Sequence, residues 1–397
     1  MKDNPIKEKN NILKKKILIF SCHGGGGHMS AALAIEANLG QHETKIIDAM
    51  AEPVEHLDPL YYLSFKKFSG QRFYNFLLRY NKKRLVNLFF QFGSLMIDLN
   101  KKSLYKTFSQ VIEKEKPDLI ISVIPLLNQF FAKIAEEKNI PYVLVPTDLD
   151  IKTFIKNIKL DHKYAKLCLG FDFPEIKNSI KPGHIPGSAI AITGFPIRPA
   201  FFEKKNKDYI KQKLAITHNH PIVLLVMGAT GSNVTLKYLY ELIKIKMPFH
   251  LIICTGRSYY LKKLIKTISF PDTITFTIAD GDAEISDFMA ITNICITKPG
   301  SVTFAETLYM DIPVLIDNTT PALLWEQKNI DMVKNYGIGS IITHLHDVKR
   351  LVTSYIIDKE LRVLTQHNIK ALPKKYFNTE FSTLINTIFT EQEKNSF

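Results

Sequence analysis

Short apolar runs recur along the first half of the chain, separated by stretches in which apolar residues have helical spacing. Nearly continuous runs of this length are typical of parallel strands that are covered on both faces. We predict such strands at Ile17–Cys22, Lys45–Asp48, Leu119–Ile124, Tyr142–Val145 and Leu167–Leu169. A predicted helix over His28–Leu39 follows the first strand. The alternation of strand and helix predicts a doubly wound α/β unit.

The same alternation restarts after residues 194–199, whose sequence GFPIRP suits a stiff connector. The second series of strands is predicted at Ile222–Met227, Phe249–Cys254, Thr273–Ile278, Ile294–Thr297 and Pro313–Ile316. We therefore predict an α/β fold of two Rossmann-like doubly wound domains, residues 17–195 and 196–377, that face a cleft. A helix over Asn378–Glu393, within the segment 378–397, is expected to return to the first domain.

Residues 57–108 break this pattern, because they contain no clear strand and alternate aromatic with basic residues. Residues 54–110 hold 10 Lys or Arg against 3 Asp or Glu, an excess of +7. A helical insertion with one apolar and one cationic face is suited to a membrane surface. The alternative is a helical pair packed on the sheet with a solvated basic face. The predicted membrane contacts are Lys66, Lys67, Arg72, Lys82, Lys83 and Arg84.

The whole chain carries a formal net charge of +14, and its Lys-rich residues 1–16 are predicted to form a disordered tail. A charge of this size indicates an anionic partner: nucleic acid, anionic lipid or a phosphorylated substrate. No usual nucleic-acid-binding motif is present, so nucleic acid is not expected. No apolar run reaches the roughly 18 residues of a transmembrane helix, which predicts a cytoplasmic protein, peripheral on the inner face of the membrane.

Residues 24–28, GGGGH, connect the first predicted strand to the first helix. The sequence fits neither a GxGxxG dinucleotide fingerprint nor a P-loop. Gly25, Gly26 and Gly27 let the backbone approach a bound phosphate or acceptor closely. His28 lies where ligands bind in such folds and could take a proton from an attacking hydroxyl. The alternative is that His28 only caps the helix.

Two further glycine loops follow strands of the second half, at residues 227–232 and 297–303. Such loops offer backbone N–H groups to phosphates, and Glu306 lies where a carboxylate could accept both hydroxyls of a ribose. Together they suggest a nucleoside diphosphate, whereas the alternative is ordinary loops and a solvent-facing glutamate. The loop residues assigned to the donor are Gly228, Thr230, Gly231, Ser232, Gly300, Ser301 and Val302.

Five motifs, taken in order, resemble glycosyltransferase family 28. They are GGGGH with its preceding strand, GFPIRP, CTGR at 254–257, ITKPG at 296–300, and AET with Glu306. The most similar branches are the monogalactosyldiacylglycerol synthases and the processive diacylglycerol glucosyltransferases. The resemblance implies the GT-B fold, an inverting transfer from a UDP-sugar to a diacylglycerol-type lipid, and no cofactor or bound metal.

The resemblance also implies roles for individual residues. His28 becomes the general base, and Asp148, at the end of PTD 146–148, is the second candidate catalytic residue. Glu306 would hold the ribose. Residues 325–329, WEQKN, resemble a donor-sugar motif that reads approximately QExxN. The remaining residues assigned to the donor are Thr255, Gly256, Arg257, Ile278, Glu326, Gln327 and Asn329.

Some positions depart from the family pattern. The galactosyl branch tends to have a histidine where this chain has Ile124, which favours the glucosyl branch. Trp325 replaces the first residue of the donor-sugar motif, so the identity of the sugar stays open. Two other functions are also open: transfer of N-acetylglucosamine to a lipid-linked peptidoglycan precursor, and non-catalytic binding of a sugar nucleotide or nucleic acid.

Overall fold

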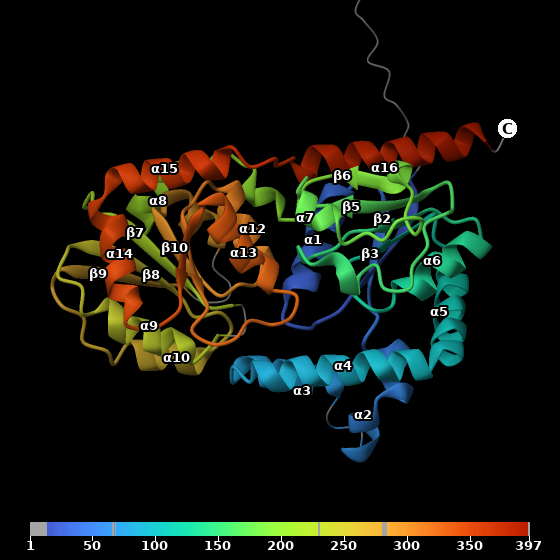
Figure 1. Ribbon diagram of the computed structural model, residues 1–397, viewed down its shortest axis with the longest axis horizontal. Helices are drawn as coiled ribbons and strands as arrows, with labels where there is room; N and C mark the ends of the chain where they lie inside the picture. The colour runs from blue at the N-terminus through green and yellow to red at the C-terminus, as the bar shows by residue number, and fades with distance from the viewer. Residues whose placement is uncertain (1–13, 66, 68, 229–230, 280–283, 396–397) are drawn as a thin grey trace, which may run out of the picture.

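The structure of the protein, a computed structural model, describes residues 14–65, 67, 69–228, 231–279 and 284–395. Most of the predicted tail therefore lies outside the described residues. Two parallel six-stranded sheets, each covered by helices, stand side by side in Figure 1. Every strand predicted from the apolar runs is present, and no strand end differs from its predicted position by more than two residues.

The first sheet has the strand order β2-β1-β3-β4-β5-β6. Its strands are β1 (Lys16–Ser21), β2 (Glu43–Asp48), β3 (Leu119–Ser122), β4 (Tyr142–Leu144), β5 (Ala165–Leu169) and β6 (Ile190–Ile192). β1 pairs with β2 on one side and with β3 on the other, with Phe20 opposite Ser122. The chain therefore changes direction across the sheet at β1, and ligands bind at such switch points, beyond the carboxyl ends of the strands.

The second sheet also has a switch point, and its strand order is β12-β11-β10-β7-β8-β9. Its strands are β7 (Ile222–Val226), β8 (Phe249–Cys254), β9 (Ile274–Ala279), β10 (Ile294–Thr297), β11 (Val314–Asp317) and β12 (Gly339–Ile342). Here β7 lies between β10 and β8, so the switch point falls beside the loops that follow β7 and β10. The GGGGH loop after β1 and the glycine loop after β7 thus occupy equivalent places in the two sheets, and the glycine loop after β10 lies next to the second of them.

The strands β6 and β12, which the sequence analysis did not predict, lie at the edges of their sheets. Both are short and largely half-buried, with the sequences IAI and GSII. An edge strand is covered less than a central one, so it lacks the continuous apolar run that marks buried strands.

The helices that cover the sheets leave the insertion as a separate layer. These helices are α1 (Gly27–Asn38), α6 (Asn128–Glu137), α7 (Pro174–Lys177), α8 (Lys207–Lys213), α9 (Val234–Leu242), α10 (Tyr259–Ile265), α11 (Ile285–Ile291), α12 (Ser301–Tyr309), α13 (Gln327–Tyr336), α14 (Asp347–Ile357) and α15 (Lys359–Lys370). The helices α2 (Pro59–Leu63), α3 (Gly70–Arg79) and α4 (Lys83–Leu99) run below the sheets in Figure 1, and α5 (Lys101–Glu115) leads back to β3. As predicted, the described residues of 57–108 form helices and no strand.

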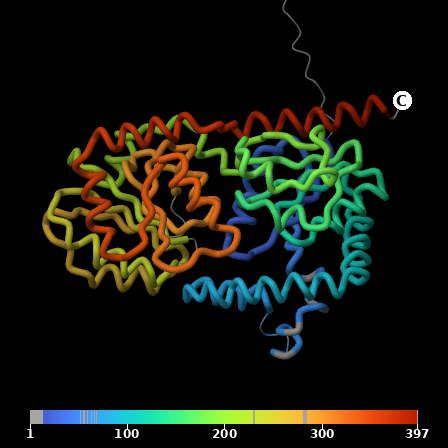
Figure 2. Tube along the Cα trace, in the orientation of Figure 1, coloured from blue at the N-terminus to red at the C-terminus, as the bar shows by residue number. Residues whose placement is uncertain are grey.

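The C-terminal helix α16 (Phe377–Lys394) crosses back over the first sheet, as Figure 2 shows. The ring of Phe389 lies 5.4 Å from that of His42, and Glu393 forms an ion pair of 3.1 Å with Lys15. These contacts pack α16 on the first half of the chain. None of the helices in the described ranges is long and apolar enough to cross a membrane.

Candidate active site

The GGGGH loop leaves the N-terminus of α1 open toward the space between the sheets. Gly25 and Gly26 adopt positive φ values of 69° and 91°, which glycine tolerates without strain. Gly26 is the N-cap of α1 and offers no side chain, so the first N–H groups of the helix are free to bind a ligand. Gly25, Gly26 and Gly27 all line the cleft at this point.

His28 is held at the start of α1 by contacts to one of its two ring nitrogens. Its Nδ1 lies 2.9 Å from the carbonyl oxygen of Val123 and 2.8 Å from Oγ1 of Thr147. A carbonyl can only accept, so Nδ1 carries the proton and Nε2 keeps its lone pair. Burial lowers the pKa of His28 to about 4, because the imidazolium loses its hydration, although the Val123 carbonyl opposes this effect. The imidazole is therefore neutral at physiological pH and can accept a proton.

Two cavities of different character meet at His28. One is a cleft of about 300 Å³ between the two halves of the chain, which we term the polar cleft because it is the more polar of the two. The other is a largely apolar cavity of about 520 Å³ that extends beneath the helical insertion. Both are lined by the same group of residues at the junction: Gly24, His28, Tyr74, Asp148 and Trp325. The His28 side chain is thus accessible to molecules in the polar cleft and in the apolar cavity alike.

The polar cleft collects many of the residues that the sequence assigned to the donor. α12 begins at Ser301, and its N-cap Gly300 again supplies no capping side chain. The N-termini of α1 and α12 face each other closely, because a Cβ added at Gly27 would lie 3.3 Å from Cγ2 of Val302. Two positive helix ends therefore point at one space, which suits a diphosphate. The assigned donor residues that line the cleft are Gly228, Gly256, Arg257, Gly300, Ser301, Val302, Glu306 and Glu326.

Three other assigned donor residues pack beside the cleft without lining it. Thr255 is fully buried and donates its hydroxyl to the carbonyl of Ala279. Ile278 packs against the core of the second half. Asn329 is also fully buried, and its amide donates to the Pro299 carbonyl and to Oγ of Ser301. In this structure Asn329 holds the 297–301 loop in place, and direct donor contact stays a prediction for all three.

The rest of the assigned donor residues lie near helix starts. Oγ of Ser232 accepts from the N–H of Val234 at the beginning of α9. Gly231 has a φ of +70° and approaches the Thr255 carbonyl too closely for any side chain. Gln327 is exposed and donates to Asp331 along α13, away from the cleft. Thr230 lies outside the described residues.

Glu306 is almost completely buried in the cleft wall, at 4% exposure. Burial raises its pKa to about 8, against the opposing effect of Arg198, whose Nη2 lies 3.9 Å from the carboxylate. Arg198 stands in the GFPIRP motif but was not predicted as a site residue. Lys298 was not predicted either, and it lies so close to Gly228 that a Cβ there would be 2.9 Å from Lys298 Cε. Cations within the ITKPG and GFPIRP motifs are the signals that could have found both.

Asp148 connects the two halves of the chain at the junction of the cavities. Its Oδ1 accepts a hydrogen bond of 2.7 Å from Oγ of Ser301. Burial raises its pKa to about 7, the hydrogen bond from Ser301 opposes this, and the nearby Glu326 adds to it. A group with such a pKa can exchange a proton near neutral pH, and a catalytic part for Asp148 stays a prediction.

The helical insertion supplies most of the apolar cavity. Side chains of α3 and α4 line it, together with Met50, Val54 and Leu57 from the segment that follows β2. The remaining apolar lining residues include Leu60, Phe73, Phe89, Phe90, Phe92, Met96, Ile97, Leu104, Leu126 and Leu127. A largely apolar cavity of this size fits hydrocarbon better than sugar or nucleobase.

The outer surface of α4 carries an apolar stripe that the sequence analysis missed. Its members recur at helical spacing and are between 49% and 70% exposed: Leu85, Leu88, Phe92, Leu95 and Leu99. Of the predicted membrane contacts, Lys67, Arg72, Lys82 and Arg84 are exposed. Lys83 differs, because its Nζ is shielded from solvent within the protein. Lys66 lies outside the described residues.

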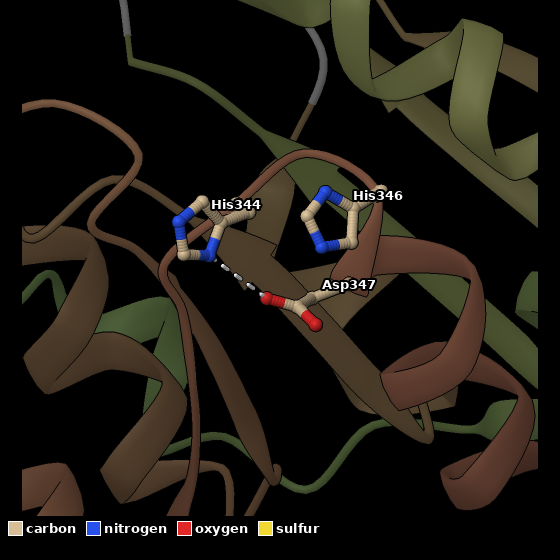
Figure 3. A group of neighbouring side chains, drawn as sticks. All are labelled: His344, His346 and Asp347. Carbon is tan, nitrogen blue, oxygen red and sulfur yellow. Dashed lines mark ion pairs between the residues drawn. The ribbon is translucent and has the colours of Figure 1, made fainter.

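His344, His346 and Asp347 form a separate group between β12 and α14, shown in Figure 3. Their possible ligand atoms lie within 4.8 Å of one another, but the two rings are stacked, with an interplanar angle of 19°. Lone pairs lie in the ring planes, so near-parallel rings do not point at a common ion. Asp347 also forms an ion pair with Arg350, with 3.1 Å between Oδ1 and Nη2. We assign this group no part in the chemistry.

Comparison with known proteins places this geometry in context. Residues 28–197 match the family described as monogalactosyldiacylglycerol (MGDG) synthase. A processive diacylglycerol beta-glucosyltransferase from Bacillus pumilus is 26% identical over 384 residues, which cover 91% of this chain and 92% of the relative.

Two solved structures show the same fold. MurG from Acinetobacter baumannii superposes with a TM-score of 0.59 at 10% identity, over 94% of this chain and 99% of MurG. A protein from Anabaena in complex with UDP-glucose superposes with a TM-score of 0.53 at 13% identity, over 96% of this chain and 100% of that protein. At such low identity, these structures bear on the fold alone.

Proposed function

We propose that this chain, a glycosyltransferase with the GT-B fold that is similar to the MGDG synthases, moves a hexose from a UDP-sugar to a diacylglycerol-type lipid at a membrane surface. The family resemblance, the fold and the enzyme class predicted from the sequence are confirmed by these similarities. The observation that carries the proposal is the meeting of a polar cleft and an apolar cavity at His28. A transferase that joins a sugar to a lipid needs such a junction.

We assign the polar cleft to the UDP-sugar. The open N-termini of α1 and α12 would hold the diphosphate, with Lys298 and Arg257 adding positive charge. Glu306 would accept the ribose hydroxyls, and Glu326, which lies beside the junction, would contact the sugar. The Anabaena protein of the same fold was solved in complex with UDP-glucose, and we propose a donor of that class for this chain.

The reaction that this arrangement supports is an in-line displacement. A lipid hydroxyl would enter from the apolar cavity and transfer its proton to Nε2 of His28 as its oxygen attacks the anomeric carbon. The bond from that carbon to the UDP oxygen breaks on the opposite face, so the configuration inverts. Backbone N–H groups at the two helix starts would stabilise the negative charge that develops on the departing diphosphate.

We place the enzyme on the inner face of the cell membrane, held by the insertion. The apolar stripe of α4 would enter the lipid interface, and the exposed cations around it would attract anionic lipid. The apolar cavity lies directly behind this surface, so an acceptor could pass from the bilayer to His28 without crossing water.

Reversing two exposed charges beside the stripe, Lys82→Glu with Arg84→Glu, should weaken binding to anionic vesicles by roughly 2–4 kcal/mol at low salt. High salt should reduce the difference, because the Debye length shrinks, while the apolar contribution of α4 remains. Vesicle co-sedimentation at two salt concentrations measures both effects. The matched control is Lys359→Glu with Lys370→Glu on α15, which lies on the opposite side in Figure 1. Equal sedimentation of the two variants would assign the basic charge to another partner.

The affinity for a UDP-sugar should rise between about pH 7 and pH 9. With a pKa of about 8, the Glu306 carboxyl is mostly protonated at pH 7 in the unliganded protein, and Arg198 and Glu284 are the charged groups that act on it. Ribose hydroxyls donate better to the ionised form, so binding releases a proton and strengthens as the pH rises through 8. Calorimetric titration of the wild type and of Glu306→Gln tests this. The variant cannot ionise and should lose the dependence; a flat profile for the wild type contradicts the assignment.

The competing functions predict different products. A panel of UDP-sugars should be tested with diacylglycerol in anionic vesicles and, separately, with a lipid-linked peptidoglycan precursor. Transfer of N-acetylglucosamine to that precursor would support the first alternative. Binding of a UDP-sugar or of duplex DNA without transfer to any acceptor would support the non-catalytic one. Hexose transfer to diacylglycerol, which we expect, excludes both and identifies the sugar.

A further inference from the structure

We infer that Trp325 is an acceptor-positioning residue, whose indole packs against the lipid next to the hydroxyl that His28 deprotonates. This inference rests on the proposed function and adds to it a specific contact with the acceptor. Trp325 lines the polar cleft and the apolar cavity alike, so it stands at the point where donor and acceptor must meet.

Trp325 differs in origin from the other residues that line the apolar cavity. All the other described lining residues come from positions 22–153, in the first half of the chain, whereas Trp325 belongs to the loop between β11 and α13 of the second. The acceptor cavity is therefore completed by the half of the protein that we assign to the donor.

The loop that carries Trp325 is fixed to the insertion by several contacts. The indole lies 4.8 Å from the ring of Phe90 on α4, measured between centroids. Its neighbour Leu323 is buried in a small apolar cluster with Leu77 and Val86, which Trp325 also contacts. The N–H of Leu324 donates to Oδ1 of Asn87 over 3.3 Å. These contacts hold the indole against the helices that enclose the lipid.

Two consequences follow from this position. A lipid chain that reaches His28 must pack on the indole, because the ring forms part of the wall at the junction, and a large aromatic surface binds hydrocarbon well. The ring is also part of the wall of both the apolar cavity and the polar cleft. Its removal would admit water to the donor sugar, and water could then replace the lipid hydroxyl in the displacement.

Trp325→Ala should therefore raise the KM for diacylglycerol roughly tenfold or more and raise the share of UDP-sugar that is hydrolysed. The Kd for UDP should stay near that of the wild type, because the donor contacts remain. Trp325→Phe keeps an aromatic ring and should restore most of the transfer. A purely structural role would change UDP binding and kcat together, without altering the ratio of hydrolysis to transfer.

Tryptophan fluorescence provides a second test, which does not require turnover. Trp325 is the single tryptophan of the sequence, so all of the tryptophan emission comes from this residue. Diacylglycerol with brominated acyl chains, presented in vesicles of ordinary phospholipid, should quench its emission in a saturable way. Vesicles in which only the phospholipid is brominated should quench it much less, because Trp325 lines the cavity and is not part of the outer stripe of α4.

The outcomes separate the inference from the function on which it rests. Transfer of hexose to diacylglycerol by a protein whose emission is not quenched, and whose Trp325→Ala variant keeps its KM, would overturn the inference and leave the function standing. Quenching by brominated diacylglycerol without any transfer would support the lipid contact and reject the proposed function.

Discussion

His28→Ala should bind a UDP-sugar normally and lose roughly 100- to 10,000-fold in transfer rate, the usual range for a positioned general base. The reason lies in the tautomer. The Val123 carbonyl and the Thr147 hydroxyl engage Nδ1, which leaves Nε2 as the basic atom of a side chain that lines both cavities. Initial rates with saturating donor and lipid, together with a UDP-sugar titration, measure the two properties separately.

His23 provides a matched control for His28. It lies in the same loop, but its side chain is exposed and pairs with Asp48 over 2.6 Å, away from the junction. His23→Ala should therefore keep most of the activity. A His28→Ala enzyme that stays active between pH 6 and pH 9 would show that another group takes the proton, and Asp148, with its pKa raised to about 7, would be the next candidate.

At pH 9, where its carboxyl is mostly ionised, Glu306→Ala should weaken the binding of UDP by about 2–4 kcal/mol, through the loss of two hydrogen bonds to a charged acceptor. The residue is buried in the wall of the cleft, so no solvent-exposed group can replace it there. Calorimetric titration of the folded variant with UDP is the measurement, with circular dichroism to confirm the fold.

Glu326→Ala is the matched control, because Glu326 is also buried and lines the same cleft but stands beside the junction. It should leave the UDP affinity nearly unchanged and reduce turnover and sugar preference. An unchanged Kd for UDP in Glu306→Ala would remove the ribose assignment, and an equal loss of UDP affinity in both variants would remove the distinction between them.

The sheets were predictable because their central strands are covered on both faces. Ile17–Phe20 and Ile222–Leu225 are apolar at successive positions, which marks a buried parallel strand. The glycine loops were predictable as ligand-binding loops, because each directly follows one of these buried strands at a switch point of the sheet. The edge strands β6 and β12 were missed, because half-burial leaves no comparable pattern.

Within the site, sequence position indicated which loops would converge but not which side chains would face the cleft. Gln327 and Asn329 belong to one motif, yet Gln327 is exposed on α13 and Asn329 is buried behind the 297–301 loop. The direction of a side chain at a helix start depends on tertiary packing. The spacing of residues in a motif therefore does not predict which side chains face the cleft.

The insertion shows the same limit on a larger scale. Its charge excess pointed to a membrane surface, but the exposed stripe from Leu85 to Leu99 and the cavity behind it depend on which face of α4 packs inward. Both faces of that helix are rich in apolar residues, so composition could not separate them. Lys83 is an example. It was predicted as a membrane contact with its neighbours Lys82 and Arg84, which are exposed, but its own Nζ is shielded from solvent.

The most direct test of lipid glycosylation follows the release of UDP from a UDP-hexose by the purified protein, with vesicles that contain or lack diacylglycerol. We expect UDP release to depend on diacylglycerol, to be matched by hexose found on that lipid by mass spectrometry, and to collapse in His28→Ala. UDP released equally without diacylglycerol, or hexose found on no lipid, would contradict the proposed function.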